Sequence, residues 1–113
     1  MATITNGLNF AGSGTIQVRN EANTSGILSV GSLSSTGNFG IIEVTTSANA
    51  TGLLRLNNAF GVTTTFGGTI RNGGASTVLS VEKNNDGTQI LTGANTYTGA
   101  TTINAGTLLV GQG

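Results

Sequence analysis

Short apolar runs recur along the whole chain and are separated by stretches rich in Gly, Asn, Ser and Thr. Runs bounded by such turn-forming residues are typical of β-strands. Helices are not expected, because 19 glycines are spread along the sequence and Thr, Ser and Asn disfavour helix interiors. The pattern predicts an all-β protein with strands at residues 15–18, 27–30, 41–44, 53–56, 65–70, 78–81, 88–91, 101–103 and 107–110.

These runs belong to a repeat, which is clearest between residues 16–30 and 42–56. The two segments align without a gap. Residues of the first segment recur at a constant offset in the second: Ile16, Val18, Ala22, Asn23, Gly26 and Leu28 correspond to Ile42, Val44, Ala48, Asn49, Gly52 and Leu54. Looser copies begin at Ile70 and Ile103. Such a repeat predicts stacked coils rather than a closed globule. We expect one domain, residues 1–113, with about four coils of roughly 26–31 residues at 10–38, 39–65, 66–96 and 97–113.

Two all-β architectures fit strands at this spacing: an antiparallel sandwich, and a parallel β-solenoid with one coil per repeat. In a solenoid, equivalent residues of successive coils lie about 4.8 Å apart, so similar side chains should lie over one another. A sandwich gives no reason for such repetition, and the gapless offset therefore favours the solenoid. We expect right-handed winding, because parallel crossover connections are right-handed.

The solenoid predicts columns, each made of the residues that share one position in successive coils. Inward aliphatic columns are expected to contain Ile16, Ile42, Val18, Val44 and Ile70, and a second set Leu28/Val30, Leu54/Leu56, Leu79/Val81 and Leu108/Val110. An aromatic stack is expected from Phe10, Phe39, Phe66 and Tyr97, with the glycines after them in tight turns. Outward columns are expected at Gln17–Glu43–Arg71 and at Ser29–Arg55–Ser80–Leu109. Glu43 and Arg71 would form a surface ion pair of about 0–1 kcal/mol, and Leu109 would be covered by a further coil or a neighbouring chain.

Low charge narrows the possible functions. Charged residues make up 7% of the chain, with four Lys/Arg, four Asp/Glu and a formal net charge of zero. A disordered chain with 36% hydrophobic residues would usually carry a large net charge. There is no basic footprint for nucleic acid and no polybasic membrane patch, and no apolar stretch approaches transmembrane length. The first ten residues lack the features of a signal peptide, and the absence of Cys does not establish a compartment.

The C-terminal part of the chain resembles a known family. Residues 91–110, LTGANTYTGATTINAGTLLV, resemble the autotransporter passenger-associated repeat. Its pattern is leucine, a small residue, then G-A-N-x-Y-x-G-x-T-x-I/V-x-A-G-x-L, matched by Leu91, Gly93, Ala94, Asn95, Tyr97, Gly99, Thr101, Ile103, Ala105, Gly106 and Leu108. The segment 66–74 is similar to the lead-in of this motif, whereas 84–90 and Ala100 depart from the pattern. The resemblance implies a right-handed parallel β-helix of an exported protein at the bacterial cell surface, with no catalytic residue.

Enzymatic chemistry has little support in the composition. The chain contains no His and no Cys, which excludes Ser–His–Asp and Cys–His catalysis and most transition-metal sites. The carboxylates are Glu21, Glu43, Glu82 and Asp86. Glu21 and Glu82 do not share a register in the repeat, so a positioned acid/base pair is not expected. We therefore predict a non-enzyme without catalytic, cofactor-binding or metal-binding residues. Residues 83–87 (KNNDG) offer oxygen atoms suited to calcium, but a simple turn with Gly87 at positive φ is favoured.

Two further motifs have simple structural explanations. Asn23 and Asn49 lie in glycosylation sequons, and their repetition favours equivalent polar turns. Threonine-rich segments at 63–65 and 101–102 raise an ice-binding hypothesis, which requires outward threonines in every coil. Thr45, Arg19 and Arg71 interrupt the candidate columns, so ice binding is a minor alternative.

Two non-catalytic functions remain. The first is a solenoid segment of an exported surface protein, acting as a stalk or an adhesive scaffold with a cell-surface or matrix partner. The second is a fibre subunit that associates end to end through exposed strand edges, because the chain has no Pro and few charges with which to block such edges. Concentration-dependent assembly distinguishes the two. Neither function involves nucleic acid or membrane insertion by this chain.

Overall fold

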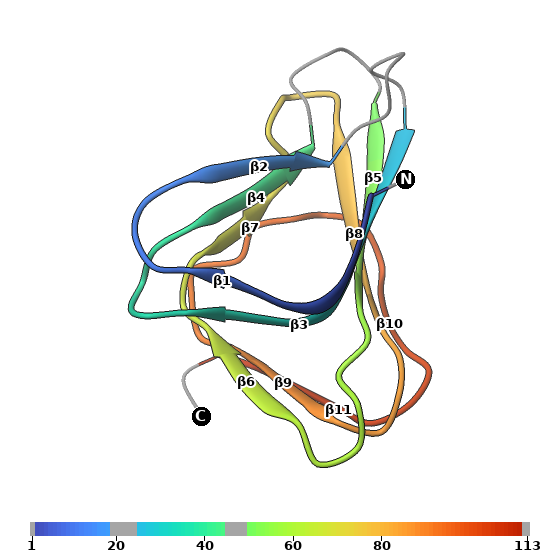
Figure 1. Ribbon diagram of the computed structural model, residues 1–113. Coiled ribbons are helices and arrows are strands. Elements are labelled where there is room, and N and C mark those ends of the chain that lie inside the picture. The colour runs from blue at the N-terminus through green and yellow to red at the C-terminus, as the bar shows by residue number, and fades with distance from the viewer. Residues whose placement is uncertain (1, 19–24, 45–49, 112–113) are drawn as a thin grey trace.

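The computed structural model describes residues 2–18, 25–44 and 50–111. Within these ranges the protein consists of strands and the turns between them (Figure 1). The strands are β1 (Ala2–Phe10), β2 (Thr15–Val18), β3 (Ser25–Ser35), β4 (Ile41–Val44), β5 (Thr51–Leu56), β6 (Thr63–Phe66), β7 (Thr69–Arg71), β8 (Val78–Lys83), β9 (Thr88–Leu91), β10 (Thr101–Ile103) and β11 (Thr107–Val110). The prediction of an all-β protein is confirmed.

Three parallel sheets form the sides of the coil. Sheet A has the order β1-β3-β5-β8-β10, sheet B the order β2-β4-β7 and sheet C the order β6-β9-β11. Strands follow one another in chain order within each sheet, so the chain winds round and returns to each side one level further on (Figure 1). This arrangement is the predicted parallel β-solenoid. Its right-handed winding stays a prediction.

The register confirms the repeat in the first coils. Ala2 pairs with Leu28, and Leu28 pairs with Leu54, so these two steps along the chain have the same length. The next step, from Leu54 to Val81, is longer by a single residue. The last step, from Val81 to Thr101, is shorter than the predicted range. The last coil is therefore a tighter turn of the same solenoid.

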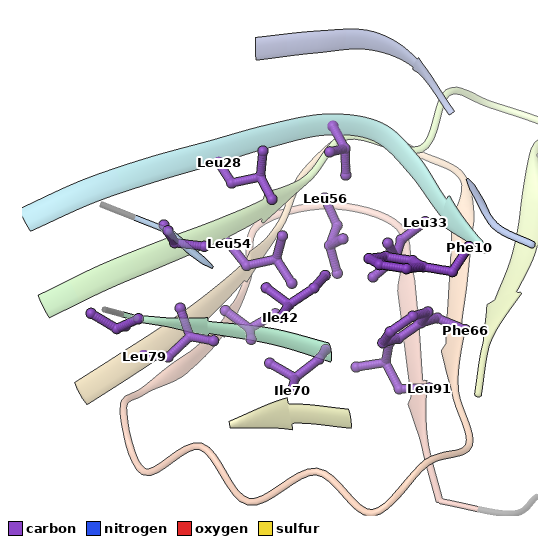
Figure 2. Close-up of a cluster of buried hydrophobic side chains, with 14 of the residues drawn as sticks. Phe10, Leu28, Leu33, Ile42, Leu54, Leu56, Phe66, Ile70, Leu79 and Leu91 are labelled. Carbon is purple, nitrogen blue, oxygen red and sulfur yellow. The ribbon is translucent and has the colours of Figure 1, made fainter. Parts of the chain in front are cut away.

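Aliphatic columns fill the interior, as expected for a solenoid (Figure 2). Ile16, Ile42 and Ile70 form one column, because Ile70 lies beside Ile42 and not beside Val44 as predicted. Ile42 and Ile70 are fully buried. Each such side chain contributes about 1.5–3 kcal/mol by leaving water, so the columns are the main source of stability.

The second predicted set of columns is wrong in its later members. Leu28 and Leu54 are followed by Val81, and Leu79 lies two residues earlier, beside Gly52. A Cβ at Gly52 would lie 2.8 Å from Val44 Cγ2, 3.2 Å from Val18 Cγ1 and 3.3 Å from Leu79 Cδ1, so the missing side chain of this glycine makes room for the valines as well as for the leucine. Leu108 and Val110 belong to sheet C instead, where they pair with Gln89 and Leu91.

The aromatic stack is also smaller than predicted. Phe10 and Phe66 pack together with ring centroids 5.5 Å apart (Figure 2). Phe39 is 46% exposed and does not join them. Instead Gly40, with a φ of 99°, lies against Phe10, and a Cβ there would come within 2.5 Å of the ring. The glycine of the second coil thus lets the rings of the first and third coils meet. Tyr97 packs at the edge of the core as a partly buried side chain.

Candidate interaction surfaces

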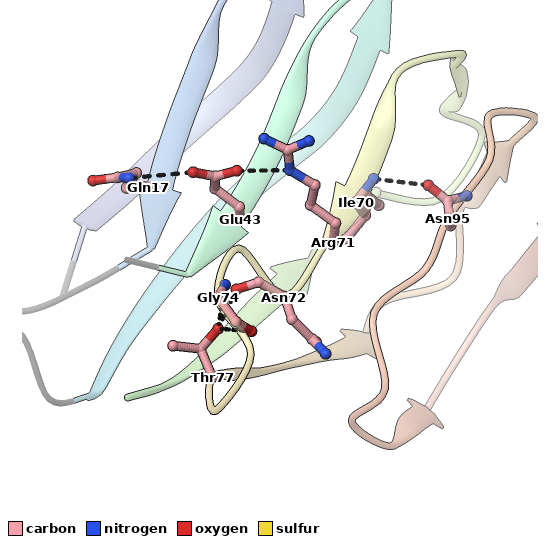
Figure 3. A network of polar contacts seen from close by, with 8 residues as sticks. All are labelled: Gln17, Glu43, Ile70, Arg71, Asn72, Gly74, Thr77 and Asn95. Atoms are coloured by element: carbon pink, nitrogen blue, oxygen red, sulfur yellow. Dashed lines mark hydrogen bonds and ion pairs between the residues drawn. The ribbon is translucent and has the colours of Figure 1, made fainter. Parts of the chain in front are cut away.

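The outer face of sheet B carries the predicted polar column (Figure 3). Gln17 Nε2 donates a hydrogen bond of 3.2 Å to Glu43 Oε2, and Arg71 Nε donates one of 2.7 Å to Glu43 Oε1. The three side chains come from successive coils. The predicted column and ion pair are confirmed, but Glu43 is buried beneath its partners, with only 6% of its surface exposed. The pair is therefore not the fully exposed surface pair that the sequence predicts.

The predicted outward column of sheet A needs a correction. Ser29 and Arg55 are followed by Glu82, whereas Ser80 pairs with Leu53. Arg55 Nε donates to Glu82 Oε1 over 2.9 Å. A hydrogen bond from Asn84 is the main cause that lowers the pKa of Glu82, and the neighbouring Arg55 adds to it, while burial opposes both. Leu109 lies in sheet C beside Ile90, which removes it from this column.

An asparagine column follows the ends of the sheet A strands. Asn84 Nδ2 donates to Asn57 Oδ1 over 3.2 Å, and Asn104 Nδ2 donates to Asn84 Oδ1 over 2.9 Å. Asn57 Nδ2 in turn donates to Ser29 Oγ over 2.7 Å. The signal for this column was present in the sequence, because an Asn directly follows each of the strands β5, β8 and β10. The amides connect four coils and fix their register.

Lys83 is fully buried, although it was expected to be part of a polar turn. Its Nζ donates hydrogen bonds to the carbonyl oxygens of Asn84 at 2.6 Å and Asn85 at 3.0 Å. Burial lowers the pKa of Lys83, and Asp86 opposes this shift. Two backbone oxygens of the 83–87 turn are therefore already bound by the Lys83 ammonium.

The turn after Lys83 also differs from the prediction in its backbone. The positive φ belongs to Asn85, at 62°, and not to Gly87. Gly87 is required for another reason, because a Cβ there would come within 2.2 Å of the carbonyl oxygen of Ala59. A close approach between coils, rather than a left-handed backbone, selects this glycine.

A buried polar cluster lies between β3 and sheet C, and it was not predicted from the sequence. Gln89 Oε1 accepts a hydrogen bond of 3.1 Å from the Leu33 backbone N–H, while Gln89 Nε2 donates one of 2.8 Å to the Leu33 carbonyl. The side-chain amide thus pairs with the β3 backbone as a neighbouring strand would. Thr64 Oγ1 and Asn58 Nδ2 also donate to Gln89 Oε1. The sequence signal for this cluster is a glutamine, Gln89, at an inward position of a strand.

The outer face of sheet C holds an uninterrupted threonine column. Thr63 pairs with Thr88, and Thr88 pairs with Thr107. The neighbouring outward column contains Thr65, Ile90 and Leu109. Among the residues expected to interrupt such columns, Arg71 lies on sheet B, and Arg19 and Thr45 fall outside the described residues.

The β10–β11 end of the solenoid exposes apolar side chains. Ile103, Leu109 and Val110 are 52%, 50% and 60% exposed. Val110 continues the inward column of Phe66 and Leu91, which are both fully buried. Its exposure therefore results from the absence of a neighbouring coil among the described residues, and not from an outward orientation.

The remaining chemistry-bearing residues do not come together in the described ranges. Glu43 and Glu82 lie on different sheets, each in its own ion pair. No group of three or more His, Cys, Asp or Glu side chains is placed to hold a metal in the part that the structure describes. Glu21 and the sequon residues Asn23 and Asn49 lie outside that part. No helix in it has the length and hydropathy needed to cross a bilayer.

Comparison with protein families identifies the last coil. Residues 81–110 match the passenger-associated-transport-repeat family. The chain carries a passenger-associated transport repeat. In the structure this repeat runs from the end of β8 through β11, so it includes the exposed β10–β11 end. The predicted resemblance is confirmed, and the repeat indicates an exported protein. No curated protein and no solved structure matches the chain.

Proposed function

We propose that the chain is a non-catalytic solenoid segment of a bacterial passenger protein, displayed at the cell surface as a stalk or adhesive scaffold. The observation that carries this proposal is the column Phe66–Leu91–Val110, in which the last side chain is open where the others are buried. Leu91 is buried because its strand, β9, lies between β6 and β11. A further coil stacked on β11 would bury Val110 in the same way. Such stacking lengthens a solenoid without changing its cross-section.

Tandem fusions test the stalk function. Two or three copies of residues 1–113 joined end to end should give a rod that lengthens by about 20 Å per copy, since each of about four coils adds one strand spacing. Small-angle X-ray scattering measures the longest dimension. An Ile42→Asp fusion, with a charge in the buried column, is the control and should not form the rod. Failure of the unmodified copies to lengthen the particle would refute the stalk.

Assembly into a fibre is the alternative, and the apolar β10–β11 end supports it. The backbone edges of β10 and β11 have no further strand beside them within the described residues, and such edges pair readily with another chain. Electron microscopy across a concentration series distinguishes the two functions. Uniform fibres that disappear in a Val110→Lys variant would favour the fibre, and monodisperse particles would favour the stalk.

Ice binding remains a minor alternative, supported by the Thr63–Thr88–Thr107 column. Its threonines repeat at the strand spacing of about 4.8 Å on one face. Inhibition of ice recrystallisation is the test, with Thr88→Tyr as the disrupting variant and Thr96→Tyr as the control outside sheet C. Activity that is absent, or equal in both variants, would exclude this function.

A further inference from the structure

A groove lies on the outside of sheet B, where its strands begin. Its volume is about 480 Å³, which is within the range of small-molecule sites. The outward column Thr15–Ile41–Thr69, contributed by three successive coils, forms one part of the lining. Ser13, Asn38 and Phe39 from the preceding turns form another. The groove thus runs along the solenoid axis rather than into the core.

The polar side chains of this groove are available to a ligand. Ser13, Thr15, Asn38 and Thr69 make no side-chain hydrogen bond to any other residue in the described ranges. Three hydroxyl groups and one amide therefore present donors and acceptors to the groove. None of the lining residues is charged. A neutral ligand rich in hydroxyl groups fits this set, whereas an acyl chain would remove the four polar groups from water without replacing their hydrogen bonds.

Phe39 and Ile41 supply the apolar part of the groove, and Phe39 is its aromatic member. The Phe39 side chain is 46% exposed, while Phe10 and Phe66 are buried in the core. The Phe39 ring is held against Gly37, where an added Cβ would lie 3.3 Å from the ring. An aromatic face carries negative charge density, so it attracts the C–H face of a sugar ring. Hydroxyl and amide groups beside such a ring then meet the sugar hydroxyls.

We propose that this groove binds a neutral sugar unit of a glycan, with Phe39 as the stacking platform and Asn38, Thr15 and Thr69 as hydrogen-bonding partners. The inference extends the adhesive part of the proposed function and rests on that part. The Gln17–Glu43–Arg71 column lies two residues further along the same strands, and on this face it offers polar groups to an adjoining sugar unit.

An NMR titration tests the groove with the whole chain. Lactose, maltose, cellobiose and diacetylchitobiose are added separately to ¹⁵N-labelled protein at concentrations up to about 20 mM, which detects millimolar binding. At least one saccharide should shift the amide signals of residues 13–15 and 38–41. Phe39→Ala should weaken that binding about tenfold, because the stacking surface is removed.

Phe60→Ala is the matched control, since Phe60 is 87% exposed on a turn outside the groove. This variant should bind as the unchanged protein does. The proposal is overturned if no saccharide shifts these amides, if Phe39→Ala binds equally well, or if sialyllactose binds more tightly than lactose. The tandem-fusion measurement does not depend on Phe39, so a groove that fails to bind sugar leaves the stalk function intact.

Discussion

Lys83 takes the inward position that Val30 and Leu56 hold in the two preceding coils. A buried ammonium without partners would be strongly unfavourable. The turn that follows β8 solves this problem, because the carbonyl oxygens of Asn84 and Asn85 accept hydrogen bonds from Lys83 Nζ. A polar side chain is therefore tolerated in an aliphatic column where the strand ends beside free carbonyl groups.

Lys83 makes stability depend on alkaline pH. Because burial lowers its pKa below the ordinary value of 10.5, the unfolded chain binds more protons between the two pKa values. The free energy of unfolding should then rise as the pH increases from the folded pKa toward 10.5. Urea unfolding at several pH values measures this rise. This rise in the free energy of unfolding should disappear in the Lys83→Met variant. An unchanged rise in that variant would contradict its assignment to Lys83.

Glu82 gives a dependence of the same sign at acid pH, because its folded pKa is also lowered. Its pKa is lowered from 4.5 by the hydrogen bond from Asn84 and by Arg55, so its stabilising effect is present above 4.5. That effect should be lost as the pH falls through the folded pKa. Thermal unfolding from pH 6 to pH 3 should show a smaller loss for Glu82→Gln than for the unchanged protein. An identical loss of thermal stability in both proteins would indicate that Glu82 does not contribute to the pH dependence.

The phenylalanines differ sharply in their expected effects. Phe66→Ala removes a fully buried ring that contacts Phe10 and should cost about 3–5 kcal/mol. Phe39→Ala removes a half-exposed ring and should cost roughly 0.5 kcal/mol or less. Chemical denaturation of both variants gives the comparison. Equal costs would refute the corrected aromatic stack.

At the scale of elements, sheet C and the second half of β3 are joined by side chains rather than by a regular ladder. Gln89 pairs with both backbone groups of Leu33, and Asn58 and Thr64 support it. The polar cluster thus fixes the distance between β3 and β9 at this corner. Its members lie far apart in the sequence, so their hydrogen bonds depend on the winding of the whole coil.

Gln89→Leu tests this connection. The change leaves the Leu33 N–H and carbonyl without their partner in the interior, and such a loss costs about 1–3 kcal/mol. Thr65→Leu is the matched control at an exposed, outward position of sheet C and should change the free energy of unfolding by roughly 0.5 kcal/mol or less. Equal effects of the two substitutions in urea unfolding would contradict the role of Gln89.

The parts of the fold that sequence predicted are those in which adjacent coils repeat without insertion. Ile16 and Ile42 could be aligned because both copies have the same length, and the Gln17–Glu43–Arg71 column followed from alternation. Val81, Lys83 and Val110 were misplaced because the later coils differ in length. A shift of two residues leaves each side chain on the same side of its strand, inward or outward. Hydrophobic alternation alone therefore could not detect the shift.

The candidate surfaces were less predictable than the core for a similar reason. The threonine column requires Thr63, Thr88 and Thr107 to be aligned, and their spacings along the chain are unequal and both shorter than the offset between the first two copies. The groove combines Ser13, Phe39 and Thr69 from three coils, and none of these residues forms a motif along the chain. Both surfaces exist only through the stacking of coils.

At the scale of the whole molecule, function follows from stacking in register. Hydrophobic columns hold the coils together, polar columns fix their alignment, and the apolar β10–β11 end provides a surface on which stacking can continue. The passenger-associated transport repeat occupies this end. Both the stalk and the fibre require the same property. The side chains of each coil must be aligned with the equivalent side chains of the next coil.

Disulfide trapping tests this register most directly, because the chain contains no Cys. Thr63 and Thr88 are paired in neighbouring coils, and adjacent strands bring Cα atoms within the range that a disulfide spans. Thr63→Cys combined with Thr88→Cys should therefore oxidise fully within the monomer. Thr63→Cys combined with Ile90→Cys, two residues out of register, should oxidise much less. Equal oxidation of the two pairs, or preferential oxidation of the second, would contradict the stacked-coil structure.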